Sequence, residues 1–196
     1  MIPALILLLA AVAYRIAAGL LIHSGTALWV SNFAPMAAIA LCGAVYFPAR
    51  FKFTVPLGAL FISDLVLNYI YRAPLVQAQM AGHYIALFLI GLLGMAIQNR
   101  ASLKTLLPAS LLGSVIFYVV VNSFSWLSEP GYTKDFAGFI QAQTVGLSQY
   151  SATPTWMFFR NSVLSDLFFT FLFVTCMNFG PQTSRAQTGA ALPRAA

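Results

Sequence analysis

Three ionisable residues lie inside long apolar stretches of the sequence: Arg15, Asp64 and Asp166. A charged side chain at the middle of a bilayer costs roughly 2.5 to 3.5 kcal/mol on insertion scales, so each needs a partner or a water-filled cavity. We therefore expect both aspartates to point into a helix bundle, with Arg15 within ion-pairing or water-bridged reach of at least one of them. One guanidinium and two carboxylates suit a ligand that carries both charge signs.

Other polar residues recur at the spacing that places them on one face of a helix. One stripe contains Asp64, Asn68 and Tyr71, and a second contains Ser162, Asp166 and Thr170. The third and longest stripe comprises Ser110, Ser114, Tyr118, Asn122 and Trp126. Such stripes line a small hydrophilic cavity or, alternatively, join neighbouring helices through hydrogen bonds.

If successive helices alternate in direction, these polar groups gather at one level of the membrane. The sequence therefore predicts an outward-facing polar pocket that binds a small hydrophilic ligand. The residues expected to line it are Arg15, Asn32, Asp64, Asn68, Asn122, Arg160, Asn161 and Asp166.

Enzymatic chemistry is a rival interpretation, because two intramembrane aspartates can act as a general acid and base. Both aspartates occur in a Ser-Asp-Leu context, and the sequence contains no HExxH motif and no nucleotide-binding loop. Cys42 and Cys176 lie in apolar stretches without the spacing of a metal site, and His23 and His83 stand alone. We expect a protein that is not an enzyme and that carries no cofactor or metal.

The composition identifies the elements that must position these residues. Apolar residues make up 60% of the 196 residues, charged residues make up 7%, and the mean hydropathy is +0.84. A helix needs roughly 20 apolar residues to cross the bilayer, and several stretches of that length follow one another. We predict an all-α polytopic bundle of about six transmembrane helices. They are expected near residues 3–22, 34–48, 53–71, 81–98, 105–126 and 160–178.

The bundle is expected to form a single domain over residues 1–180, followed by a flexible tail over residues 181–196. The first apolar run resembles a signal peptide, but no basic residue precedes it, and we expect it to remain as a helix. The segment from 127 to 159 is a long connection rich in aromatic residues, which suits the membrane interface or a lid over a cavity.

The ten lysines and arginines are spread singly along the chain, and this argues against binding of nucleic acid. With six spans, more of them fall on the side of both termini than on the side of the 127–159 connection. Because cytoplasmic loops are enriched in Lys and Arg, both termini are expected in the cytoplasm. The segments Ile62-Ser63-Asp64-Leu65 and Leu164-Ser165-Asp166-Leu167 also suggest two three-helix halves of opposite topology.

Several stretches resemble an uncharacterised family of six-helix bacterial membrane proteins described as transport proteins. They are Asn32 to Leu41, Pro56 to Leu65, and Phe158 to Leu167. The resemblance implies a location in the bacterial inner membrane and a role in small-molecule uptake.

The predicted layout is also similar to that of the substrate-binding S components of energy-coupling-factor transporters. That resemblance implies a partner, an energising module that docks on a small-residue face around Ala13 to Ala17. Arg15 interrupts this otherwise apolar face. The alternative is an accessory subunit of a larger membrane complex, bound to other membrane subunits.

Overall fold

The computed structural model describes residues 2–25, 33–76, 79–149 and 151–179. Within these ranges the chain forms seven α-helices and no strand, so the predicted all-α class is confirmed. The helices are α1 (Ile2–His23), α2 (Met36–Tyr46), α3 (Thr54–Ile70), α4 (Gln79–Ile97), α5 (Leu103–Ser128), α6 (Phe136–Thr144) and α7 (Thr155–Phe179). Two short 3-10 turns, η2 (Ala49–Phe51) and η3 (Gln98–Arg100), precede α3 and α5.

Five helices are long and apolar enough to cross a membrane: α1, α3 together with η2, α4, α5 and α7. The sixth expected span, α2, has only 11 residues. At 1.5 Å per residue it is about 16 Å long, roughly half of the ~30 Å hydrocarbon thickness. This helix is therefore a half-span.

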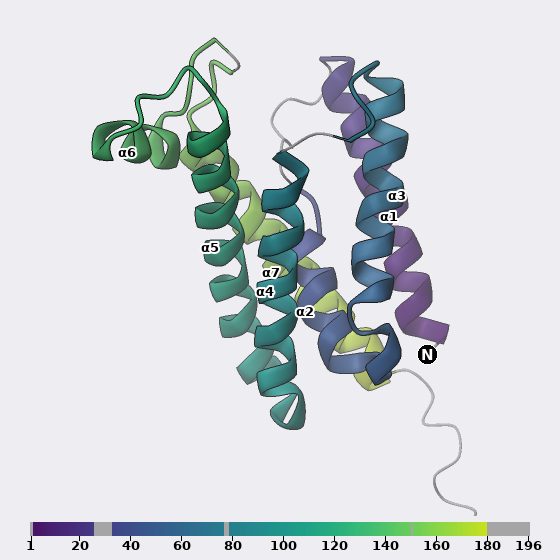
Figure 1. Ribbon diagram of the computed structural model, residues 1–196. Helices are drawn as coiled ribbons and strands as arrows, with labels where there is room; N and C mark the ends of the chain where they lie inside the picture. The colour runs from purple at the N-terminus through teal and green to yellow at the C-terminus, as the bar shows by residue number, and fades with distance from the viewer. Residues whose placement is uncertain (1, 26–32, 77–78, 150, 180–196) are drawn as a thin grey trace, which may run out of the picture.

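Figure 1 shows how the helices alternate in direction along the bundle. The beginning of α1 and the end of α7 lie at one end, and α6 with its flanking segments lies at the other. The short helix α2 occupies the half of the bundle that contains the beginning of α1. The alternation agrees with the predicted helix bundle, although five of the described helices, rather than the expected six, are long enough to cross the membrane.

The half-span α2 forms the centre of the core. Every residue from Met36 to Ala44 is buried, and this helix packs against α4 and α7. Alanine and glycine make this possible, since small residues let membrane helices approach closely. At Gly94 of α4, an added Cβ would lie 2.7 Å from the carbonyl oxygen of Leu41 and 2.8 Å from the Cβ of Ala44. Gly94 therefore sets the distance between α2 and α4.

The connection after α5 contains a helix, α6, that hydropathy does not indicate. It has nine residues and is capped by Asp135, whose side chain accepts a hydrogen bond from the Gly138 amide. The last helix also begins earlier than expected, at Thr155 rather than near residue 160. Pro154 precedes it directly, and proline favours such an entry because it has no N–H to leave unpaired.

Candidate functional site

A cavity of about 130 Å³ lies inside the bundle, and we call it the inner cavity. Its lining comes from α1, α2, α3, α4, α5 and α7, so every helix except α6 contributes. The polar members are Arg15, His83, Ser162 and Asp166. The remaining wall residues are Ala34, Met36, Ala37, Leu60, Phe117 and Val121.

Arg15 on one side of the inner cavity is held by α3. Its guanidinium donates to a carboxylate oxygen of Asp64 at 2.5 Å and to the hydroxyl of Ser63 at 2.5 Å. The other carboxylate oxygen of Asp64 accepts from the Tyr84 hydroxyl at 3.3 Å. The side chains of Arg15 and Asp64 are 18% and 11% exposed. The predicted ion pair is therefore present, and it leaves the guanidinium accessible to the cavity.

Asp166 on α7 is held in a different way, by neutral donors. Its carboxylate accepts from the main-chain amide of Ala38 at 3.1 Å and from the Ser114 hydroxyl at 2.7 Å. The residue is 2% exposed. One turn further along, Thr170 donates to the Ser110 hydroxyl at 3.0 Å. The polar stripes of α5 and α7 therefore face each other, and in their buried part they join the two helices.

The contact between Asp166 and Ala38 places the start of α2 at the middle of α7. Asp166 follows Thr155 by eleven residues and precedes Asn178 by twelve within the apolar span of α7. The first amides of a helix carry partial positive charge, and a carboxylate is stabilised beside them. A half-helix that starts within the bundle thus faces the inner cavity with its positive end.

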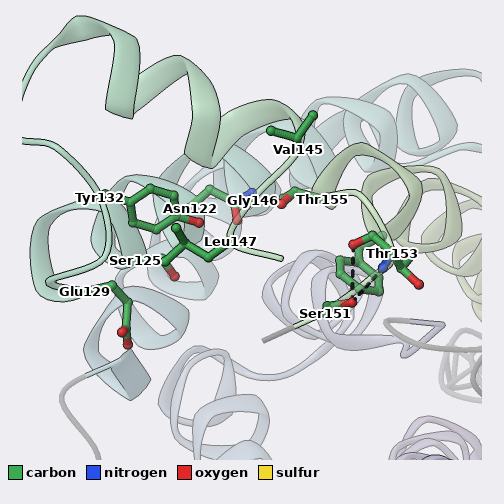
Figure 2. Close-up of a pocket in the computed structure, with 11 residues that line it drawn as sticks. Asn122, Ser125, Glu129, Tyr132, Val145, Gly146, Leu147, Ser151, Thr153 and Thr155 are labelled. Atoms are coloured by element: carbon green, nitrogen blue, oxygen red, sulfur yellow. Dashed lines mark hydrogen bonds between the residues drawn. The ribbon is translucent and has the colours of Figure 1, made fainter. Parts of the chain in front are cut away.

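A second cavity of about 430 Å³ lies at the α6 end of the bundle, and we call it the loop cavity. Figure 2 draws its eleven lining residues, which come from the end of α5, the segments around α6 and the start of α7. They are Asn122, Ser125, Glu129, Tyr132, Val145, Gly146, Leu147, Ser151, Thr153, Thr155 and Phe158.

The two cavities follow each other along the same two helices. On α5, Val121 lines the inner cavity and its neighbour Asn122 lines the loop cavity. On α7, Ser162 lines the inner cavity, and Phe158, one turn earlier, lines the loop cavity. The two cavities therefore adjoin each other along α5 and α7.

The structure distributes the predicted site residues over several places. Arg15 and Asp166 line the inner cavity, and Asp64 supports Arg15 from behind. Asn122 lines the loop cavity, with its amide nitrogen bound to the Tyr118 carbonyl oxygen at 2.9 Å.

Three predicted residues, Asn68, Arg160 and Asn161, lie outside both cavity linings. Asn161 accepts from the Arg160 guanidinium at 3.2 and 3.3 Å, on the stretch of α7 between the two cavities. Asn68 donates to the Leu75 carbonyl oxygen at 3.1 Å and so fastens the connection after α3. Asn32 lies outside the described residues.

Two of the contributors that sequence reasoning missed show what kind of signal was lacking. The main-chain amide of Ala38 holds Asp166, and no side-chain pattern announces a main-chain donor. Glu129 lines the loop cavity, and the sequence distinguishes this residue only as the one glutamate in the chain.

The described residues contain no group of His, Cys, Asp and Glu that could hold a metal ion. The ring of His23 stacks on Tyr71 at 4.7 Å between centroids, and the ring of His83 packs on Phe117 at 5.5 Å. Each histidine therefore belongs to an aromatic pair near an end of its helix.

Comparison with known proteins gives a family without an assigned activity. The model of a family of unknown function, DUF6580, matches residues 1–187. No curated protein and no solved structure matches the chain. Since the matched range covers nearly the whole sequence, the chain belongs to the DUF6580 family of unknown function.

Proposed function

We propose that this protein binds a small zwitterionic solute in the inner cavity and takes part in its uptake across the membrane. The observation that carries the proposal is that Arg15 and Asp166 line one cavity inside a transmembrane bundle. Keeping both charges in an apolar bundle costs several kcal/mol on insertion scales. Binding of a ligand that carries both charge signs gives a reason to retain them.

The size of the inner cavity limits the ligand. A cavity of about 150 Å³ holds one benzene molecule, so about 130 Å³ takes a solute of roughly six non-hydrogen atoms. The ligand carboxylate would bind Arg15, and the ligand ammonium would bind Asp166. Transporter sites are often built in this way from interrupted helices near the bilayer midplane.

The outer face of α1 favours a partner for this binding function. Ala10, Ala13 and Ala17 are exposed there, and small residues of this kind let a second membrane helix approach closely. Arg15 turns away from this face towards Asp64, so it does not interrupt the small-residue surface. This arrangement supports an S-component-like subunit that docks on an energising module, with an accessory subunit of another membrane complex as the second candidate.

We place the protein in a bacterial inner membrane, with both termini in the cytoplasm and the α6 end outside. Single cysteines at Ser148 and Ser184, in a variant without Cys42 and Cys176, test this orientation. A membrane-impermeant thiol reagent should label position 148 in intact cells and position 184 only after lysis. Labelling of both positions in intact cells contradicts the orientation.

A thermal-shift assay on the purified protein tests the ligand class. Four compounds with the same number of non-hydrogen atoms serve as ligands. Glycine carries both charges and glycolamide carries none. Glycinamide carries only the positive charge, and glycolate carries only the negative charge. Glycine should raise the melting temperature most. The Asp166→Asn variant should lose the preference for glycine over glycolate, because the carboxylate that would bind the ammonium is gone.

The double variant Arg15→Met/Asp64→Asn should lose the preference for glycine over glycinamide without leaving an isolated charge. Asp135→Asn is the control, since it removes one carboxylate outside the inner cavity. Equal stabilisation by all four compounds, or no stabilisation by any of them, would refute the proposal.

A further inference from the structure

The loop cavity has a lining unlike that of the inner cavity, because most of its polar groups are uncharged. Its hydroxyl and amide side chains both donate and accept hydrogen bonds. They are Asn122, Ser125, Tyr132, Ser151, Thr153 and Thr155. Such groups match a ligand that also carries several groups able to donate and accept.

Glu129 is the one charged residue among the described residues that line the loop cavity. A lysine lies next to it: the Lys134 ammonium donates to the carbonyl oxygens of Trp126 at 2.5 Å and of Glu129 at 2.6 Å. The Lys134 ammonium thus lies at the main chain of Glu129, so it offsets the negative charge beside the cavity only in part. The carboxylate of Glu129 still acts as a strong local acceptor.

Apolar surface completes the lining of the loop cavity. Val145, Leu147 and Phe158 lie on its wall, and Tyr132, at 8% exposure, presents an aromatic body together with its hydroxyl. In the view of Figure 2, Tyr132 and Glu129 lie on the left and Ser151 and Thr153 on the right. A sugar ring has apolar faces and a hydroxylated rim. The apolar side chains of the cavity wall can contact the faces, and its polar side chains can form hydrogen bonds with the rim.

Hydrogen bonds hold the wall in place without a ligand. Gly146 has a φ of +73°, and an added Cβ would lie 2.5 Å from the Thr155 hydroxyl oxygen. Gln141 fixes the same residue twice, through its main-chain oxygen at 2.8 Å and its side-chain amide at 3.1 Å. Ser151 and Thr153 are joined by two hydrogen bonds, at 3.0 and 3.3 Å. A preformed wall lowers the ordering cost of binding.

We propose that the loop cavity is a separate binding site for a neutral polyhydroxylated group of about the size of a hexose. Its volume of about 430 Å³ lies within the range of small-ligand pockets, ~300 to 1,000 Å³. This site differs from the proposed zwitterion site in position, volume and ligand class.

The hydroxylated group can come from a free sugar or from a glycolipid headgroup. Phe136, Ile140 and Trp156 are exposed around the loop cavity, and such side chains suit the membrane interface. The cavity is therefore within reach of either source.

Isothermal titration of the full-length protein, in a detergent whose headgroup is not a sugar, tests the ligand class. Glucose, glucuronate and glucosamine are neutral, anionic and cationic versions of one ring. Glucose should bind, and glucuronate should bind at least about tenfold more weakly because its carboxylate meets Glu129. Glucosamine should bind within about threefold of glucose, since the Lys134 ammonium at the main chain of Glu129 opposes the attraction of a cation by the Glu129 carboxylate. No binding of glucose, equal or tighter binding of glucuronate, or tenfold tighter binding of glucosamine each overturns the proposal.

Matched variants locate the site. Glu129→Gln and Thr155→Val should each weaken glucose binding at least about threefold by removing a hydrogen-bonding group from the wall. The control Asp135→Asn removes one negative charge from the same end of the bundle, outside the wall, and should leave glucose binding unchanged. Loss of glucose binding in Asp166→Asn, with no loss in Glu129→Gln or Thr155→Val, would place the sugar in the inner cavity and refute the proposal.

Nanodiscs with and without glucosyl diacylglycerol distinguish the two sources. If the source is a lipid headgroup, glucose should bind more weakly to protein in the glycolipid nanodiscs, and Glu129→Gln should remove this competition. If the source is a free sugar, glucose should bind equally in both nanodiscs. Competition that persists in Glu129→Gln and Thr155→Val contradicts a lipid headgroup in this cavity.

Discussion

The two Ser-Asp-Leu segments have the same sequence but different environments. On α3, Ser63 accepts a hydrogen bond from Arg15 and Asp64 forms an ion pair with the same side chain. On α7, Asp166 accepts only neutral donors, and the buried Ser165 hydroxyl has no hydrogen-bond partner among the described residues. The same three residues thus compensate a cation in one half of the bundle and hold the start of a half-helix in the other.

The difference shows why two aspartates are needed around the inner cavity. Asp64 neutralises Arg15, so that a cation can remain inside the bundle. Asp166 supplies a carboxylate that no lysine or arginine among the described residues pairs with by a salt bridge. Together they leave one group of each sign on the wall of the cavity, the Arg15 guanidinium and the Asp166 carboxylate.

The largest expected effect comes from removing Asp166. Asp166→Ala deprives the Ala38 amide of its acceptor, leaves the Ser114 hydroxyl with only the Ser110 carbonyl oxygen, and enlarges the inner cavity. We expect a loss of about 3 kcal/mol in the free energy of unfolding, measured in mixed micelles. Asp166→Asn is the control and should lose less than half of this, since its side-chain oxygen still accepts. Equal losses in both variants would show that the hydrogen bonds accepted by the Asp166 side chain do not contribute to the free energy of unfolding.

A smaller effect is expected when the Arg15–Asp64 pair is broken. Arg15→Met or Asp64→Asn alone leaves a charge inside the bundle without its partner, and each should cost about 2 kcal/mol of unfolding free energy. The double variant should be more stable than either single variant, because no isolated charge remains. A double-mutant cycle measures this coupling. Additive losses would show that the pair contributes nothing as a pair.

The two serines should differ by about 1 kcal/mol. Ser63→Ala removes an acceptor from Arg15 and should cost about 1 kcal/mol of unfolding free energy. Ser165→Ala removes a buried hydroxyl that has no hydrogen-bond partner within the described part of the chain, and it should be neutral or stabilising. The same unfolding assay checks both. A clear destabilisation by Ser165→Ala would show that this hydroxyl has a role in α7.

The smallest effect concerns α6 and pH. The Gly138 amide and the Thr133 hydroxyl hold the pKa of the Asp135 carboxyl below its ordinary value of 3.8. The Asp135 carboxyl therefore binds a proton more tightly in the unfolded segment than in the folded helix. Its contribution to the stability of α6 is fully present above pH 3.8 and is lost as the pH falls through the lowered pKa. Hydrogen exchange of the α6 amides should rise over this range. Asp135→Asn, which still caps the helix, should show no such change.

Hydropathy and helical spacing were sufficient to predict much of this molecule. The five long helices follow from apolar length, and the pairing of Arg15 follows from the cost of a lone charge. The nine-residue α6 is too short and too polar to stand out among apolar spans. Its cap at Asp135 is the signal that a closer search for capping residues would use.

The arrangement of the cavities could not be predicted from the sequence. Spacing shows which residues share one face of a helix, but not how two helices are aligned, so the contact between Ser114 and Asp166 was not foreseen. The contact of Asp166 with α2 depends on a main-chain amide at Ala38, which any residue except proline provides. Asn122 lines the loop cavity and its neighbour Val121 the inner cavity, because successive residues of a helix point in directions roughly 100° apart.

The most direct test of the central claim is calorimetric titration of glycine into the purified protein with the inner cavity filled. Ala34 lines this cavity, and Ala34→Leu should fill part of it without changing any charge. Ala13→Leu adds the same side chain on the exposed face of α1 and serves as the control. The account predicts that glycine binds the wild type and Ala13→Leu equally and binds Ala34→Leu at least about tenfold more weakly. Unchanged glycine binding in Ala34→Leu, or no glycine binding to the wild type, would contradict it.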